Sequence, residues 1–298
     1  MNLYKITITP TSDFVTTLRG DTLFGHFCWA IIYTFGKERL EELLKTYRED
    51  NPFLVVSDAF PSGYLPKPKM PSRFLNEKSE NKKLNRKRVW LTLDNLLKAE
   101  YKKAKRDDEI ENSNTTMLNM HNAINYKSFH TGDGFDPYGV ESSILSKRDI
   151  YILLDESKFN LSEFKEVFKL LSEMGYGKKT TIGKGRFEYK EEDIKGIKID
   201  KISTTFMTLS PFSAKNLECK NIYYEPFTRF GKFGGTRTSK NVFKKPIILA
   251  DVASVIQFEK EENMEYIGKA ITGVSDSHKD TVHQGYSIVL PLKELRDE

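Results

Sequence analysis

The sequence predicts an α+β fold built of two lobes. Residues 1 to about 190 alternate strand and helix patterns, whereas residues 196–298 contain strand patterns almost throughout. A polar, basic segment at about 64–130 interrupts the first lobe. With 298 residues, of which 38% are hydrophobic and 12% aromatic, the chain is long and apolar enough to fill a core.

The N-terminal segment predicts a half-buried strand followed by a buried helix. Tyr4, Ile6 and Ile8 alternate with polar residues, which is the period of a strand with one buried face. Residues 19–22 supply helix-start side chains, and apolar residues then recur at helical spacing over 23–35. Because this helix is apolar nearly all round, we expect it to be buried against a sheet or between the lobes.

A charged amphipathic helix is expected at 37–50, and five prolines between positions 52 and 71 then break regular structure. The segment that follows is basic: residues 60–106 hold fourteen Lys or Arg against four Asp or Glu. A charge run is usually a solvated face, but the sign of this one favours nucleic acid or an acidic partner. We interpret about 64–130 as an insertion that contains the fourth strand of the first lobe. We expect its part from 98 to 125 to be mobile unless bound.

Regular structure returns with an apolar strand at 150–154 and an amphipathic helix. We assign the N-cap of this helix to Ser162 and a left-handed C-terminal cap to Gly175. A glycine-rich loop at 175–186 then leads into a strand at 186–189. The order strand, helix, insertion, strand, helix, strand is compatible with a ferredoxin-like sandwich, in which an antiparallel sheet carries two helices on one face.

The domain boundary is expected near residue 195. Residues 1–195 form the ferredoxin-like lobe with its insertion, and residues 196–298 form a second, degenerate lobe that is rich in strands and poor in helices. The strands expected in the second lobe lie at 202–209, 222–224, 253–258 and 286–290.

The glycine-rich loop is the strongest candidate site. It carries two Gly-x-Gly pairs and four cations, so its backbone can turn through positive φ close to a ligand while its side chains supply charge for phosphate. The loop follows a helix, the reverse of a nucleotide-binding P-loop, in which the glycines precede a helix. We therefore predict contact with RNA or phosphate; the alternative is a glycine cap with solvated lysines. The residues assigned to this contact are Gly175, Gly177, Lys178, Lys179, Thr180, Thr181, Gly183, Lys184, Gly185 and Arg186.

Three further places are candidate RNA contacts. Arg19 stands at the start of the first helix, where its charge can meet a phosphate. A second cluster interleaves cations and glycines with Phe230 and Phe233, on which bases can stack; a bulged hairpin is the alternative. A third, weaker cluster lies near the C-terminus. The residues assigned in these two clusters are Arg229, Lys232, Gly234, Gly235, Arg237, His283, Gly285 and Tyr286.

Other classes of site find no support in the sequence. It shows no Ser-His-Asp order, Walker loop or paired metal-binding carboxylates, and Cys28 and Cys219 have no partners at metal-ligand spacing. We therefore expect no metal, no cofactor and no disulfide. The most apolar run, 23–35, is too short to span a bilayer and no signal-peptide pattern is present, so we expect a cytoplasmic protein without a membrane segment.

The motifs together resemble a known family. The loop at 175–185, Leu18-Arg19-Gly20-Asp21-Thr22-Leu23-Phe24-Gly25-His26, the run at 64–68 and the closing segment at 283–292 resemble the RAMP superfamily of CRISPR-associated proteins. These proteins are built from ferredoxin-like, RRM-type domains. Within the superfamily, the motifs look like the branch that supplies the fourth Csm subunit of type III-A effector complexes.

The resemblance implies a non-catalytic RNA-binding subunit of an antiviral ribonucleoprotein. Such a subunit binds the repeat-derived 5′ handle of the CRISPR RNA, docks the Cas10-type large subunit and contacts a neighbouring Csm backbone subunit. In related subunits a β-hairpin thumb reaches over the RNA, which makes target RNA a further candidate partner. The basic insertion between 67 and 130 would match the thumb, but it has no clear hairpin signal. Tyr286 joins Phe230 and Phe233 as a candidate for base stacking.

Two other functions stay open at this point. The first is a metal-independent endoribonuclease that processes CRISPR transcripts, with His26 as general acid or base and Tyr33 or a lysine assisting. A histidine between Phe24 and Phe27 on an apolar helix is more typical of a packed residue than of a base. The second is a general single-stranded RNA-binding module that works outside any complex.

Overall fold

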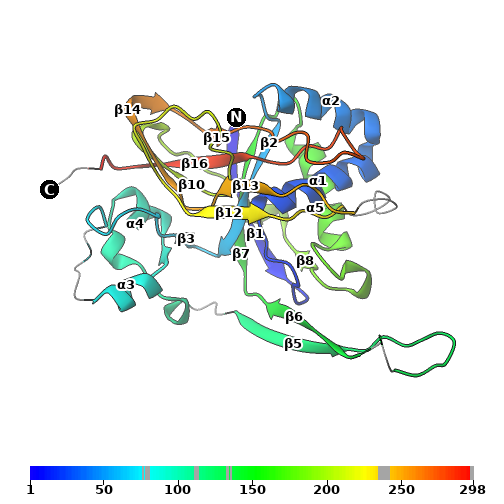
Figure 1. Cartoon of the computed structure of the whole chain (residues 1–298). Coiled ribbons are helices and arrows are strands. Elements are labelled where there is room, and N and C mark those ends of the chain that lie inside the picture. Colours follow the sequence, from blue (N-terminus) through cyan, green and yellow to red (C-terminus); the bar gives the residue numbers. More distant parts are fainter. Residues whose placement is uncertain are drawn as a thin grey trace.

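Two antiparallel sheets, each of five strands within the described residues, organise the chain (Figure 1). The structure is a computed structural model, and it describes residues 1–75, 77, 81–110, 114–131, 134, 136–233 and 242–295. Strand and helix are both present, with more strand than helix, as the sequence predicts.

The first sheet combines strands from both ends of the first lobe. Its order is β2-β7-β1-β8, with β9 also paired to β1, and every pairing is antiparallel. The buried face of β1 meets that of β7, so that Ile6 lies opposite Ile150. The strands are β1 (Asn2–Pro10), β2 (Leu54–Pro61), β7 (Arg148–Leu154), β8 (Phe187–Glu188) and β9 (Ile194–Gly196).

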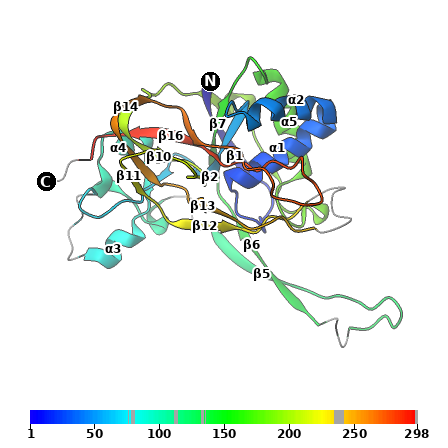
Figure 2. The same ribbon diagram turned by 45° about the horizontal axis from the view of Figure 1, so that its top comes forward.

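Helices α1 (Gly20–Phe35), α2 (Lys37–Arg48) and α5 (Leu161–Met174) lie together beside this sheet in both views (Figures 1 and 2). Aromatic rings join α1 to α5: the ring centroid of Phe27 lies 5.4 Å from that of Phe164 and 5.7 Å from that of Phe168. These contacts bury the apolar stripe of α5 and one face of α1, which confirms that the first helix is buried.

The fourth strand of the first sheet is β2, which precedes the insertion, so its expected place at 64–130 is wrong. All but one of the residues of β2 are buried, and therefore the polar–apolar alternation that marks a half-buried strand is missing. Pro61 pairs with Arg148 at the very end of the strand, where a missing N–H is tolerated. Both features hid this strand from a reading of the sequence.

The ends of α5 also differ from expectation. Its N-cap is Asn160 rather than Ser162: the Asn160 side-chain oxygen accepts the N–H groups of Ser162 and Glu163, at 3.0 Å each. The Glu163 carboxylate in turn accepts the Asn160 N–H at 3.0 Å, which completes a capping box. Gly175 ends the helix with φ 81° and ψ 164°, so it turns through positive φ but is not a left-handed helical cap.

The second sheet has the order β11-β14-β10-β16-β15, again antiparallel throughout. Numbered along the chain, the path β11-β14-β10-β16 reads 2-3-1-4, and the path β2-β7-β1-β8 of the first sheet reads the same. The described part of 202–292 contains no helix. Four of its strands were predicted: β10 (Ile202–Thr208), β11 (Asn221–Tyr223), β14 (Val255–Asn263) and β16 (Tyr286–Leu292). Three were not: β12 (Pro226–Arg229), β13 (Ile247–Ala250) and β15 (Tyr266–Gly268).

The insertion between β2 and β7 has two parts. The first contains β3 (Leu65–Pro66), α3 (Lys82–Lys87), β4 (Trp90–Leu91), α4 (Leu93–Leu97) and 3-10 turns at Tyr101–Lys103 and Asp107–Glu109. Leu96, Tyr101 and Ala104 are buried, so this part is ordered without a partner, contrary to the expected mobility from residue 98. The second part is a hairpin of β5 (Thr115–His121) and β6 (Tyr138–Ile144) that projects from the body (Figures 1 and 2).

The two lobes share one core. Apolar side chains from both sheets, including Ile152 of β7 and Ile288 of β16, belong to a single buried cluster. The Gln284 side chain bridges the lobes, because its Oε1 accepts the Val56 N–H at 3.0 Å and its Nε2 donates to the Val56 carbonyl at 2.8 Å. Gly20 packs against the same peptide: a Cβ at Gly20 would lie 2.3 Å from the Val56 oxygen.

We expect Gly20→Ala to destabilise the protein by about 1–3 kcal/mol, the usual cost of forcing a methyl group into a packed site. Urea denaturation measures the free energy of unfolding. Gly25→Ala is the matched control in the same helix: its Cβ meets nothing within 4 Å, so we expect a gain of about 0.5–1 kcal/mol from helix propensity. Equal stability of the two variants would contradict this account of the lobe junction.

Candidate nucleic-acid interface

The glycines of the 175–186 loop are required by its geometry. Gly175, Gly177, Gly183 and Gly185 have φ values of 81°, 84°, 88° and 75°, in the region that side chains with a Cβ rarely adopt. At the neck of the loop the backbones also touch, since a Cβ at Gly185 would lie 2.0 Å from the Tyr176 carbonyl oxygen. Gly183, by contrast, faces open space. The loop therefore has a tight neck and an open outer turn.

Backbone hydrogen bonds fix the neck. The Tyr176 N–H donates to the Gly185 carbonyl at 2.8 Å, and the Gly185 N–H donates to the Asp13 carbonyl at 2.9 Å. The Tyr176 ring is fully buried, and its hydroxyl donates to the Thr17 carbonyl at 2.7 Å. The loop is thus tied to the segment that joins β1 to α1.

Two side chains hold the next two peptides. The Lys178 N–H donates to Thr16 Oγ1 at 3.0 Å, and the Gly177 N–H donates to His26 Nε2 at 3.2 Å. Since His26 accepts at Nε2, its ring is neutral and carries its proton on Nδ1. Burial lowers the pKa of His26 to about 4, which keeps the ring neutral at physiological pH.

The N–H groups of the next three residues remain unused. Lys179 has left-handed φ and ψ of 66° and 23°, and a 3-10 turn at Thr180–Ile182 follows. The N–H groups of Lys179, Thr180 and Thr181 have no acceptor within the described part of the chain. Successive N–H groups in such a turn form a concavity that suits an anion.

The four cations of the loop differ in how they are paired. The Lys184 ammonium lies 2.7 Å from both carboxylate oxygens of Asp13, so its charge is balanced. Lys178 and Arg186 are exposed and have no ion pair within the described residues. Lys179 lies between these cases, with its Nζ 3.4 Å from the hydroxyl of Tyr138 on β6. Free positive charge on the loop therefore concentrates at Lys178 and Arg186.

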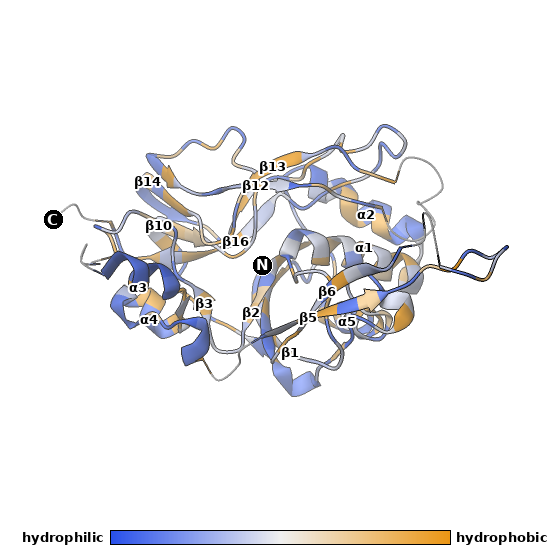
Figure 3. Cartoon of the chain, turned by 60° about the horizontal axis from the view of Figure 1, so that its bottom comes forward, coloured by the Kyte–Doolittle hydropathy of each residue, from blue (hydrophilic) through white to orange (hydrophobic). Residues whose placement is uncertain are grey.

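The hairpin β5–β6 stands beside this loop. Besides the contact of Lys179 with Tyr138, the base of the hairpin is held by paired backbone bonds between Phe14 and Ser143, of 2.9 and 2.8 Å. Residues 114–144 include one Lys against three Asp or Glu, so the hairpin is not basic. Large apolar side chains are instead exposed along it (Figure 3); they are Met117, Leu118, Met120, Ile124, Tyr126, Phe129, Tyr138 and Ile144.

The sequence missed this hairpin because both of its faces are exposed. Nearly every residue of β5 is exposed, so no side of the strand needs to be apolar and no alternation marks it. The hairpin also runs to Ile144, beyond the expected end of the insertion near 130. A signal available in the sequence was the clustering of apolar and aromatic residues in a segment with little charge.

Arg19 and Arg229, assigned from the sequence to RNA, are instead neutralised at the lobe junction. Arg19 Nη1 lies 2.5 Å from Asp251 Oδ1 and 3.3 Å from Asp58 Oδ2. Arg229 donates to both carboxylate oxygens of Asp21, at 2.6 and 2.7 Å. Their positive charge therefore serves the contact between the lobes and is not free for a phosphate.

The buried carboxylates of the junction respond to these partners. Burial acts to raise the pKa of Asp21, but His283 and Arg229 outweigh it, so that its pKa is well below its usual value. Burial raises the pKa of Asp58 to about 7, against the attraction of Arg19. The pKa of His283, which lies 3.2 Å from Asp21, is lowered by burial.

The C-terminal cluster is also structural. Tyr286 is fully buried and its hydroxyl donates to the Tyr47 carbonyl at 2.8 Å, so the ring is not available for base stacking. A Cβ at Gly285 would lie 2.4 Å from the Lys269 carbonyl oxygen, so this glycine permits close packing of two backbones. His283 is buried beside Asp21. The assignment of all three to RNA contact is corrected.

The second glycine–cation cluster is divided. Phe230 is 73% exposed and keeps its candidacy for base stacking, whereas Phe233 is buried. Lys232 Nζ lies 5.7 Å from the ring centroid of Phe243. Gly234, Gly235 and Arg237 lie outside the described residues.

Comparison with known proteins now identifies the family. The sequence profile of the RAMP superfamily matches residues 7–188, more than half of the chain. The chain belongs to the RAMP superfamily. No curated protein sequence matches it significantly.

Solved structures share the fold of this RAMP chain over its whole length. A chain of the Csm1-Csm4 cassette in complex with pppApA aligns with a TM-score of 0.62 and 18% identity, covering 100% of both chains. A chain of the Csm3-Csm4 subcomplex in the type III-A CRISPR-Cas interference complex aligns with a TM-score of 0.58 and 16% identity, over 99% of this chain and 100% of that one. Csm4 is the component that both structures contain.

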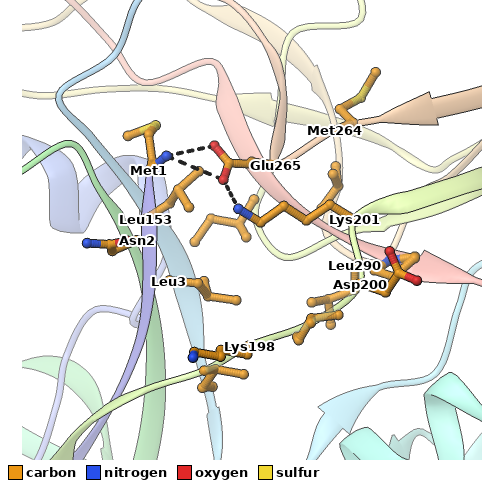
Figure 4. A pocket seen from close by; sticks show the side chains of 15 residues that line it. Met1, Asn2, Leu3, Leu153, Lys198, Asp200, Lys201, Met264, Glu265 and Leu290 are labelled. Atoms are coloured by element: carbon orange, nitrogen blue, oxygen red, sulfur yellow. Dashed lines mark hydrogen bonds and ion pairs between the residues drawn. The ribbon is translucent and has the colours of Figure 1, made fainter.

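Away from the loop, the RAMP chain has a cavity of about 180 Å³ between its two lobes. Leu3, Leu153 and Leu290 contribute to its lining, and the Met1 ammonium and Lys201 converge on the carboxylate of Glu265 (Figure 4). With its carboxylate paired and its lining largely apolar, the cavity has no concentration of cations that would suit a polyanion.

Metal sites and membrane segments were sought over the same described ranges. They hold no group of three or more His, Cys, Asp or Glu side chains that could bind a metal ion. Likewise, no helix in them is long and apolar enough to cross a bilayer.

Replacing Arg229 in this RAMP protein should affect stability. We expect Arg229→Met to cost about 3 kcal/mol in the free energy of unfolding, because Asp21 keeps a buried charge without its bidentate partner. Urea denaturation is the measurement. Lys37→Ala, which removes an exposed pair with Glu41, is the control and should leave the midpoint nearly unchanged. A large loss of RNA affinity at unchanged stability would contradict the structural role of Arg229.

The neutral state of His26 predicts a pH dependence. The pKa of about 4 in the folded protein lies below the usual 6.5, so the unfolded chain binds more protons between these values. The contribution of His26 to stability is complete above pH 6.5 and is lost as the pH falls toward 4. The difference in unfolding free energy between wild type and His26→Gln should therefore shrink over this window. A difference independent of pH would contradict the neutral assignment.

Proposed function

We propose that this RAMP chain is a non-catalytic RNA-binding subunit of a type III-A CRISPR effector complex and binds the repeat-derived 5′ handle of the CRISPR RNA. One observation carries the proposal: the rigid glycine-rich loop presents two unpaired cations and three unused N–H groups beside an exposed apolar hairpin. Membership of the superfamily and the fold shared with chains of Csm4-containing assemblies support it.

The loop would grip the RNA backbone and fix its register. Lys178 and Arg186 would meet phosphates, with Lys179 and the N–H groups of 179–181 adding hydrogen bonds. The glycines, Thr180, Thr181 and Lys184 would shape the loop, Lys184 through its ion pair with Asp13. Phosphate contacts of this kind carry no sequence information, so recognition of the handle would come from base contacts nearby.

The hairpin β5–β6 would act as the thumb. Exposed apolar and aromatic side chains suit contact with base faces, and the lack of positive charge makes the hairpin a poor phosphate binder. We therefore assign the thumb to residues 114–144 rather than to the basic segment before it. A thumb beside the handle site could also meet target RNA.

The proposed assembly follows the partners named for the similar structures. Chains of this fold occur with Csm1 and with Csm3, so we propose a Cas10-type large subunit and a backbone subunit as partners in the cytoplasm. Co-purification with these two proteins and a bound RNA supports this; a free monomer would favour the general RNA-binding module.

We also propose that both lobes are ferredoxin-like, with a boundary near 195. Each sheet contains the same 2-3-1-4 path of antiparallel strands, and the second carries loops where the first carries helices. Residues 1–195 would form the first lobe, with the insertion between β2 and β7, and residues 196–298 the second.

The geometry favours binding over cleavage. A general base needs a lone pair directed at the substrate, whereas the Nε2 lone pair of His26 accepts the Gly177 N–H. The exposed ring of Tyr33 lies on the same helix and stacks on Trp29. We therefore assign His26 no catalytic role.

Removing the unpaired cations tests the function. We expect Lys178→Ala with Arg186→Ala to weaken binding of handle RNA and to lower the slope of log K against log salt by about 0.7 for each lost phosphate contact. Filter binding over a salt series measures both quantities. Lys165→Ala, on α5 and paired with Glu191, is the control of equal chemistry.

The same titration, carried out in EDTA, also reports on cleavage. Intact RNA is expected at every protein concentration. Unchanged affinity and slope in the double variant would refute the loop as the RNA site, and specific cleavage that disappears in His26→Ala would refute the non-catalytic assignment.

A further inference from the structure

His26 links helix α1 to the glycine-rich loop. Of the side chains that accept N–H groups from Gly177 and Lys178, Thr16 belongs to the segment before α1 and His26 to the helix itself. Helix α1 is buried against α5 and begins at the lobe junction. His26 is thus the point at which the most rigid element of the first lobe reaches the loop.

We propose that His26 is a positioning residue for RNA binding: its imidazole orients the Gly177 peptide so that the next residues face the RNA backbone. The inference rests on the proposed function, and the ligand is the phosphodiester backbone of a single-stranded RNA. Lys178 follows this peptide directly, and the unused N–H groups of residues 179–181 come next. A change in the Gly177 peptide would therefore turn the whole outer half of the loop.

The contacts of His26 distinguish positioning from simple packing. Its ring lies 4.8 Å from the Tyr176 ring, a contact that any aromatic side chain could make. The hydrogen bond from Gly177, however, needs an acceptor at the reach of Nε2. Gly177 has little freedom to seek another partner, because a Cβ there would lie 2.6 Å from Thr16 Cβ, which shows how closely its backbone is packed.

Two substitutions separate these roles. His26→Phe keeps a ring of similar volume against Tyr176 but has no acceptor. His26→Gln places an amide oxygen at about the reach of Nε2 and so keeps the acceptor without the ring. Packing alone predicts that Phe is the better replacement, whereas positioning predicts that Gln is.

The test uses the full chain with two measurements. Hydrogen exchange at the Gly177 amide, measured without RNA, reports the contact itself. Fluorescence anisotropy with a labelled single-stranded handle RNA reports affinity. We expect His26→Phe to speed exchange and to weaken affinity about fivefold, the loss of roughly one hydrogen bond, while His26→Gln restores both to within about twofold. If the Phe variant does not fold, His26→Met replaces it.

The outcomes are separable. Unchanged exchange in His26→Phe, or a Gln variant as defective as the Phe variant in both measurements, overturns the inference. Faster exchange at unchanged RNA affinity also overturns it, since the contact would then be structural only. If wild-type affinity does not depend on Lys178 and Arg186, the proposed function fails and takes this inference with it, even though the exchange result still confirms the contact.

Discussion

The buried carboxylate of Asp21 is the interaction on which the arrangement of this molecule depends. It lies in the first turn of α1, is fully removed from solvent, and receives both donors of Arg229 from the second lobe. A buried charge is costly unless it is paired and hydrogen-bonded, so the position of Asp21 dictates where the second lobe must sit. Arg19 repeats the pattern with Asp58 and Asp251, and Gln284 ties the adjoining peptide. The start of α1 is therefore fixed, and His26 and the glycine-rich loop are positioned from it.

This use of charge explains why counting cations does not locate the RNA site. Arg19, Lys184 and Arg229 are balanced by carboxylates, whereas Lys178 and Arg186 are exposed without an ion pair in the described part of the chain. A phosphate gains most from a cation that has no carboxylate to leave. The interface is consequently small and rigid, and its neighbour, the hairpin, contributes apolar surface instead of charge.

The sequence predicted those elements that have one buried and one exposed side. Strand β1, helices α2 and α5 and four strands of the second sheet all show a clear period. Strand β2 was missed because it is buried on both faces, and the hairpin was missed because it is exposed on both. In each case nothing requires apolar and polar residues to alternate. The same limit applied to Tyr286, whose burial in the junction no local pattern reveals.

The sequence by itself determined the α+β composition, the glycine positions that permit the loop and the chemical character of its side chains. The tertiary structure decided which of those side chains are free. Arg229 meets Asp21 across 208 residues, and Gly177 meets His26 across 151. Such contacts depend on how the sheets and helices pack, so they leave no trace in local spacing. Local chemistry thus specified a cationic loop with four glycines, and packing selected Lys178 and Arg186 from among its charges.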